Sequence, residues 1–131
     1  MYEAVTKDIR VAVEPHFMPN QSDPEQHQYL WAYHIEIVNL GEKTVQLKDR
    51  FWQISDANGE IQEVTGAGVV GEQPILQPGE RFTYTSGCPL KTPSGFMVGK
   101  YTMINKDDGT LFDVNIPAFS LDMPDMARSY H

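Results

Sequence analysis

Residues 66–74 read Gly66-Ala-Gly-Val-Val-Gly-Glu-Gln-Pro74, and this stretch decides between two classes of fold. Its GxGxxG spacing binds dinucleotide phosphates when it connects a strand to a helix. Here a helix has no room to follow, because Pro74 comes three residues after the last glycine and the turn Gln77-Pro78-Gly79-Glu80 comes soon afterwards. The glycines therefore predict a connection between strands in an all-β protein.

Alternation of apolar and polar residues predicts the strands themselves. In residues 29–37, five apolar side chains fall on one face of a strand: Tyr29, Trp31, Tyr33, Ile35 and Ile37. We expect further strands at residues 9–13, 45–54, 61–64, 82–84, 96–104, 111–116 and 119–121. No window has helical periodicity, and turn signals recur about every 8 to 12 residues. The pattern predicts a fibronectin type III or immunoglobulin-like β-sandwich of two antiparallel sheets, with about seven to nine strands.

Three local signals predict where the strands bend or break. The inward-facing positions change phase between residues 47 and 52, which indicates a β-bulge near Lys48 to Arg50. Asn58-Gly59 is typical of a hairpin with a type I′ turn. We expect a long loop to begin at Pro15 and Gly87-Cys88-Pro89 to interrupt the sheet, because proline cannot donate to a ladder.

Length and composition limit the classes of protein that fit. A chain of 131 residues is one domain's worth, and we expect that domain at residues 1–124 with a flexible tail at 125–131. Cys88 is the only cysteine and has no internal disulfide partner, and the chain has no apolar run of about 18 residues. These features favour a cytoplasmic protein without membrane insertion. The formal net charge of −8 argues against a nucleic-acid partner.

Several motifs taken together resemble the ApaG family of small bacterial proteins. The stretches that carry the resemblance are Phe51–Asp56, Gly66–Pro74, Tyr84–Gly87, Gly95–Tyr101 and Pro117–Leu121. The resemblance covers about residues 6 to 124. Phe51 and Cys88 depart from the family pattern, in which a polar residue and a small apolar residue are usual at these positions.

The resemblance implies a fibronectin type III-like sandwich in a bacterial cytoplasm, with no established enzymatic activity and no cofactor. It also implies an association with magnesium and cobalt efflux or resistance. Related domains in a eukaryotic F-box protein and in a DNA polymerase-interacting protein imply a protein-binding module. Where the family has been ascribed phosphate or dinucleotide binding, the glycines credited match Gly66, Gly68 and Gly71.

Protein recognition is the leading hypothesis from the residues. The predicted contact residues are Val69 and Val70 in the glycine-rich loop, and Arg50 beside Trp52 on the surface near the bulge. The alternative is a weak phosphate-containing ligand, such as diadenosine tetraphosphate or pyrophosphate, held by residues 66–72. Against it, the carboxylate of Glu72 would repel an anion at about 6 Å by roughly 3 kcal/mol, unless distant cations cancel that charge.

The sequence predicts neither a catalytic nor a metal site. The histidines have no ligand spacing, and Asp107-Asp108 fits a solvated hairpin turn better than a magnesium site. Cys88 has no histidine near it in sequence to activate the thiol. The expected protein is therefore a non-enzymatic binding module whose partner the sequence does not name.

Overall fold

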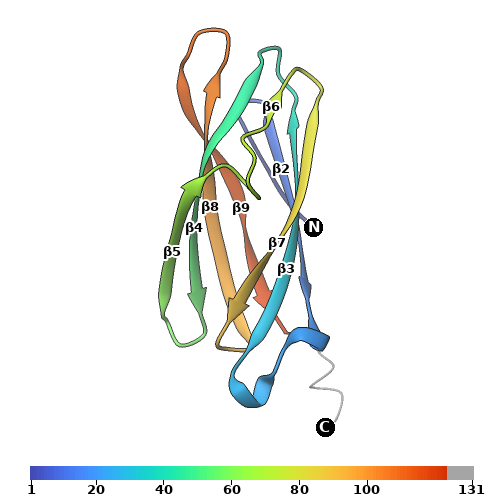
Figure 1. The fold of residues 1–131 in the computed structure, drawn as a ribbon, viewed down its shortest axis with the longest axis vertical. Helices are drawn as coiled ribbons and strands as arrows, with labels where there is room; N and C mark the ends of the chain where they lie inside the picture. The colour runs from blue at the N-terminus through green and yellow to red at the C-terminus, as the bar shows by residue number, and fades with distance from the viewer. Residues whose placement is uncertain (124–131) are drawn as a thin grey trace.

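The computed structural model describes residues 1–123, and these form an all-β sandwich (Figure 1). The predicted fold class is confirmed, and the tail expected at residues 125–131 lies outside the described residues. The elements of the described part are β1 (Tyr2–Thr6), β2 (Ile9–Phe17), the 3-10 helices η1 (Pro19–Gln21) and η2 (Pro24–Gln26), β3 (Tyr29–Asn39), β4 (Val45–Asp56), β5 (Ile61–Ala67), β6 (Ile75–Leu76), β7 (Arg81–Leu90), β8 (Ser94–Asn105) and β9 (Leu111–Asp122).

The strands form two antiparallel sheets. One sheet has the order β1-β2-β3-β7, and the other has the order β5-β4-β8-β9 with β6 paired to β4. The five alternating apolar side chains of β3 are all buried between the sheets, as their spacing predicts. No helix among residues 1–123 is long and apolar enough to cross a membrane.

Two bulges bend the second sheet. The register between β4 and β8 shifts between Leu47 and Asp49, which places the first bulge at Lys48 and confirms the predicted change of phase. The second shift lies between Met97 and Gly99 of β8, where Val98 faces Pro117 and its neighbour, so that β9 carries one extra residue. Because a bulge leaves a residue unpaired, β9 continues past the proline, and the two short strands expected there form one strand.

Prolines elsewhere also lie inside strands, contrary to expectation. Pro15 is part of β2, and Pro89 is part of β7. The partner strand β1 ends at the pair of Tyr2 with Val13, so one side of β2 is open beyond that point. β7 is an edge strand throughout. In both places the missing N–H faces away from the ladder and removes no hydrogen bond.

Two turns differ from the expected types. β1 and β2 are joined at Lys7 and Asp8, which have φ of 47° and 66° although neither is a glycine, and for this reason the sequence analysis does not predict a hairpin there. The β4–β5 hairpin forms as predicted but without a type I′ turn, since only Gly59 has a positive φ. Its form is set by Asp56, whose Oδ1 accepts from the N–H groups of Asn58 and Glu60.

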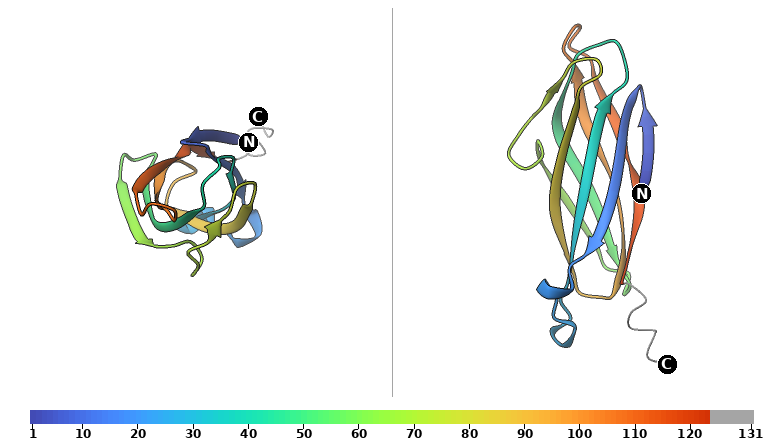
Figure 2. Two further views of the ribbon diagram at one scale, coloured as in Figure 1. Left: turned by 90° about the horizontal axis from the view of Figure 1, so that it is seen from above. Right: turned by 90° about the vertical axis from the view of Figure 1, so that its right-hand side faces the viewer.

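The sandwich is closed along one side and open along the other. On the closed side β9 packs against β1 and β2, and the rings of Tyr2 and Phe119 are 5.9 Å apart. On the other side β5 and β7 are the free edges of the two sheets. Seen from above, β5 stands away from the ring of strands (Figure 2). We call the face between β5 and β7 the open side.

Candidate functional site

The glycine-rich loop, residues 66–72, is a tight turn on the open side; we call it the glycine turn. Val69 and Glu72 exchange backbone hydrogen bonds of 2.8 and 2.9 Å. Between them, Val70 has φ 43° and Gly71 has φ 81°, the positive angles of a type I′ turn. The chain therefore reverses direction here without a helix, as the sequence predicts.

Glycine is needed at each of the three positions of the motif for a different conformational or steric reason. A Cβ on Gly66 would lie 2.9 Å from the guanidinium of Arg50, which rests against this residue. A Cβ on Gly68, which has φ 64°, would collide with the carbonyl oxygen of Glu72. Gly71 has open space around it and is required only by its φ of 81°. The GxGxxG spacing is thus explained by the geometry of a turn.

The bulge anchors the glycine turn to β4. The carbonyl oxygen of Lys48 accepts from the N–H of Gly68 at 2.8 Å and from Nε2 of Gln73 at 2.9 Å. The N–H groups of Gly68, Val69 and Glu72 all donate to carbonyl oxygens of the protein. A phosphate-binding nest needs free N–H groups. Most of the N–H donors of this loop are already used within the protein, so they are not available to a phosphate.

Arg50 points inward beside the glycine turn. It pairs with Gly66 on β5 and with the buried Tyr101 on β8, so these three positions share one face of the sheet. Its Nη1 donates to the carbonyl oxygens of Ala67 at 3.1 Å and Gly68 at 2.9 Å. The sequence predicted an exposed Arg50; the structure places it half-buried and facing between the sheets.

A pocket of about 190 Å³ lies next to this guanidinium. We call it the Arg50 pocket; its lining residues are Tyr33, Arg50, Val69, Val70, Gly71, Tyr84 and Ser86. The Tyr84 and Tyr101 hydroxyls form a buried hydrogen bond of 2.5 Å. Burial raises the pKa of Tyr33, Tyr84 and Tyr101, and the positive charge of Arg50 acts in the opposite direction. The hydroxyls therefore stay protonated and remain donors at neutral pH.

The predicted contact residues do not all reach the surface. Val70 is 54% exposed at the tip of the turn, whereas Val69 is buried beneath it. Trp52 is 3% exposed and packs in the core against Tyr33 and Phe119, so the expectation of a surface contact there is wrong. Trp52 faces inward for the same reason as Arg50, since alternate residues of a strand share a face.

Sequence reasoning missed the side chains that β7 and β3 supply. Tyr33, Tyr84 and Ser86 fall on inward positions, which the strand pattern indicates, but their approach to Arg50 depends on how the two sheets face each other. A second depression of about 250 Å³ lies farther along the open side, between Ile61 of β5 and Leu90 of β7. Both depressions are thus on the same side of the molecule.

Metal and thiol chemistry have little support. Among residues 1–123, no group of three or more His, Cys, Asp or Glu side chains is placed to hold a metal ion. Cys88 is buried, and burial raises the pKa of its thiol to about 11. Asp108 accepts from the N–H of Thr110 in its own hairpin turn.

Comparison with known proteins gives one consistent family. The family model described as "ApaG domain" matches residues 19–105. Proteins named ApaG from Brucella anthropi and Brucella canis are 57% and 56% identical over 129 residues, covering 98% of each chain.

Solved structures agree with this result. A crystal structure described as an ApaA protein from Bordetella pertussis is 50% identical, has a TM-score of 0.86, and covers 89% of this chain and 94% of its own. The C-terminal domain of wzt, 11% identical with a TM-score of 0.55, shares the fold alone; it covers 94% of this chain and 77% of its own. With the family model matching well over half its length and relatives this similar along almost all of it, the chain belongs to the ApaG family.

Proposed function

We propose that the protein is a non-enzymatic protein-interaction module whose contact surface is the open side of the sandwich around the glycine turn. The observation that carries the proposal is the conformation of Val70. This residue is 54% exposed and has φ 43°. A β-branched residue in the left-handed region costs about 1–2 kcal/mol, and Val70 recovers little of that by burial.

Strain of this kind clusters at functional positions. Asparagine or glycine would fit the same turn at lower cost. An exposed valine at the tip of a rigid turn instead presents apolar surface to a partner, and Ile61, 61% exposed at the start of β5, adds more on the same side. Both residues therefore favour an interface over a loop selected for stability alone.

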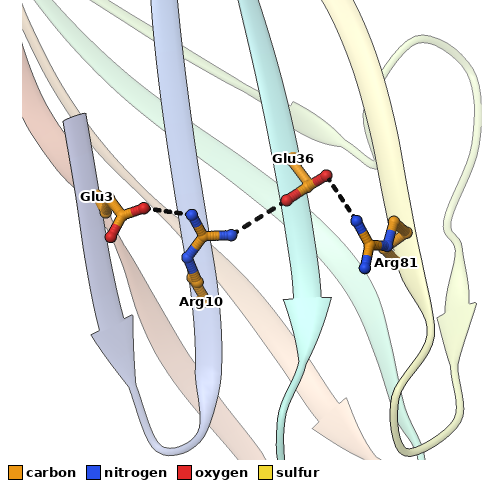
Figure 3. Close-up of polar contacts among 4 residues, drawn as sticks. All are labelled: Glu3, Arg10, Glu36 and Arg81. Carbon is orange, nitrogen blue, oxygen red and sulfur yellow. Dashed lines mark hydrogen bonds and ion pairs between the residues drawn. The ribbon is translucent and has the colours of Figure 1, made fainter. Parts of the chain in front are cut away.

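The outer face of the first sheet is a poorer candidate surface. Its charged side chains already pair with one another in a row from β1 to β7: Glu3 with Arg10, Arg10 with Glu36 at 3.1 Å, and Glu36 with Arg81 at 3.2 Å (Figure 3). A partner would have to replace these contacts. The open side has no such row of ion pairs in the described part of the chain.

The phosphate alternative has less support than protein recognition. The glycines are explained by the turn, three of its amides are used internally, and Arg50 is the one cation lining the pocket. A pocket of about 190 Å³ is also smaller than the 300–1,000 Å³ usual for drug-sized ligands. On this proposal, the protein acts in the cytoplasm, and any effect on magnesium or cobalt efflux results from its binding to the protein partner.

The experiment is partner capture with a matched pair of variants. Val70→Asn keeps the turn and removes the exposed apolar side chain, and Val5→Asn makes the same change on β1, where Val5 is 60% exposed on the opposite edge. Immobilised wild-type and variant proteins are incubated with lysate from the source cells, and captured proteins are quantified by mass spectrometry.

We expect a protein that wild type and Val5→Asn retain equally and that Val70→Asn loses. Equal retention of every captured protein by Val70→Asn and wild type would contradict the proposed surface. Circular dichroism and unfolding in urea show whether each variant is folded, so a loss caused by misfolding is recognised.

A further inference from the structure

Among the residues that the structure describes, Arg50 has no acidic partner, although the protein is acidic. The full chain has 18 acidic and 10 basic residues. The ion pairs of the described residues involve Arg10, Arg81, Lys100 and His16, but not Arg50. Leaving a half-buried charge without a counter-charge is unfavourable. The fold nevertheless points this side chain inward, where Gly66 makes room for it.

The guanidinium is held in place with part of its donor set free. Only Nη1 donates, to the carbonyl oxygens of Ala67 and Gly68. Within residues 1–123, Nε and Nη2 have no protein acceptor, and Arg50 lines the Arg50 pocket. A guanidinium fixed through one nitrogen can offer its other N–H groups in a fork that matches a carboxylate.

The remaining walls of the pocket supply neutral donors. Tyr33, Tyr84 and Ser86 carry hydroxyl groups, of which that of Tyr84 is hydrogen-bonded to Tyr101, and Val69 and Val70 contribute apolar lining. One positive charge with neutral donors matches a singly charged anion. A phosphate dianion would leave a second charge uncompensated in a protein whose formal net charge is −8.

We propose that the Arg50 pocket binds a carboxylate group of the partner protein, with Arg50 as the charged contact and Tyr33 and Ser86 as neutral donors. This inference rests on the proposed interaction module and names the chemistry that the partner brings to it. The carboxylate enters beside Val70, so that one residue of the partner packs on the valine while a neighbouring acidic group pairs with the arginine.

The test is a titration followed by amide NMR of the folded protein. Two probes separate the sources of a carboxylate: N-acetylglutamic acid α-amide carries only the side-chain group, and N-acetylalanine carries only the terminal one. Inorganic phosphate is the third probe. A small carboxylate is expected to bind with a Kd on the order of millimolar. The amide signals of Val70, Gly71 and Ser86 should shift and saturate with one of the two carboxylates.

Variants show whether carboxylate binding depends on the residues of the Arg50 pocket. Arg50→Gln should weaken binding of that carboxylate at least about tenfold, whereas Arg81→Gln, which makes the same charge change on the outer face, should leave it unchanged. If Arg50→Gln disturbs the glycine turn, Ser86→Ala decides, because it removes a donor and keeps the arginine; we expect several-fold weaker binding. Unchanged affinity in Ser86→Ala, the absence of shifts with both carboxylates, or stronger shifts with phosphate would overturn the inference.

The outcome is separable from that of the proposed function. In one outcome, capture of the partner depends on Val70 but is unaffected by the small carboxylate that binds the pocket. This result would refute the carboxylate contact and leave the proposed interaction module intact. Carboxylate shifts together with capture that ignores Val70 would refute the module, and with it the assignment of the carboxylate to a partner.

Discussion

The glycine turn makes a quantitative prediction, because its three glycines are required for three different reasons. Replacing each by alanine should destabilise the protein in a fixed order, with Gly68→Ala far above Gly71→Ala and Gly66→Ala.

The magnitudes follow from the local geometry. At Gly68 a Cβ meets a backbone carbonyl that cannot move without breaking the turn, so the left-handed cost of about 1–2 kcal/mol adds to the loss of two backbone hydrogen bonds, about 1 kcal/mol each. At Gly71 the added Cβ has open space, and only the backbone cost of about 1 kcal/mol remains. At Gly66 the obstacle is the far end of a flexible arginine, and we expect about 1 kcal/mol or less.

Equilibrium unfolding in urea measures the series. A difference of about 2 kcal/mol or more between Gly68→Ala and Gly71→Ala should appear as a shift of the midpoint by about 1 M at an unchanged slope. Equal destabilisation by the two variants, or a neutral Gly68→Ala, would refute the steric account of the motif.

The other predictions concern buried polar groups and metal binding. Burial raises the pKa of Tyr84 and Tyr101, so the folded state holds these protons more tightly than the unfolded state. The contribution of these two tyrosines to stability should be constant below about pH 10 and fall above it, and the fall should be shallower in Tyr84→Phe, as followed by urea unfolding across pH. Tyr101→Phe leaves the Tyr84 hydroxyl without its partner and should cost about 1–3 kcal/mol in the same assay at neutral pH. Cys88 should react with a thiol reagent only after unfolding, since it is buried and its pKa is raised to about 11; fast labelling of the native protein would contradict this. Equilibrium dialysis with cobalt should show no tight stoichiometric binding, and a one-to-one complex would overturn the view that cations act through a partner.

Periodicity in the sequence was sufficient to predict most of the fold. The inward face of β3 follows directly from its alternation, and the bulge at Lys48 follows from the change of phase that it causes. The strand β1 was missed because its turn has neither glycine nor asparagine, and the positive φ of Lys7 and Asp8 is set by the pairing of β1 with β2.

The candidate site was predictable only in part. Arg50 lies two residues before the inward-facing Trp52 in β4, so the two side chains point to the same face of the sheet. The bulge therefore indicates that Arg50 points inward, but its exposure was predicted wrongly. That Gly66 makes room for the guanidinium depends on the register of β4 with β5, which no local pattern encodes. The hydroxyls of Tyr33 and Ser86 reach the same pocket only because the two sheets face each other across the open side.

Hydrogen–deuterium exchange of the protein, alone and saturated with its captured partner, tests the central claim most directly. The account predicts that the partner protects the amides of the glycine turn and of β7 around Ser86, and leaves exchange along β1 unchanged. Protection confined to β1, β9 or the outer face of the ion-paired sheet would place the partner elsewhere and contradict the claim that the open side is the contact surface.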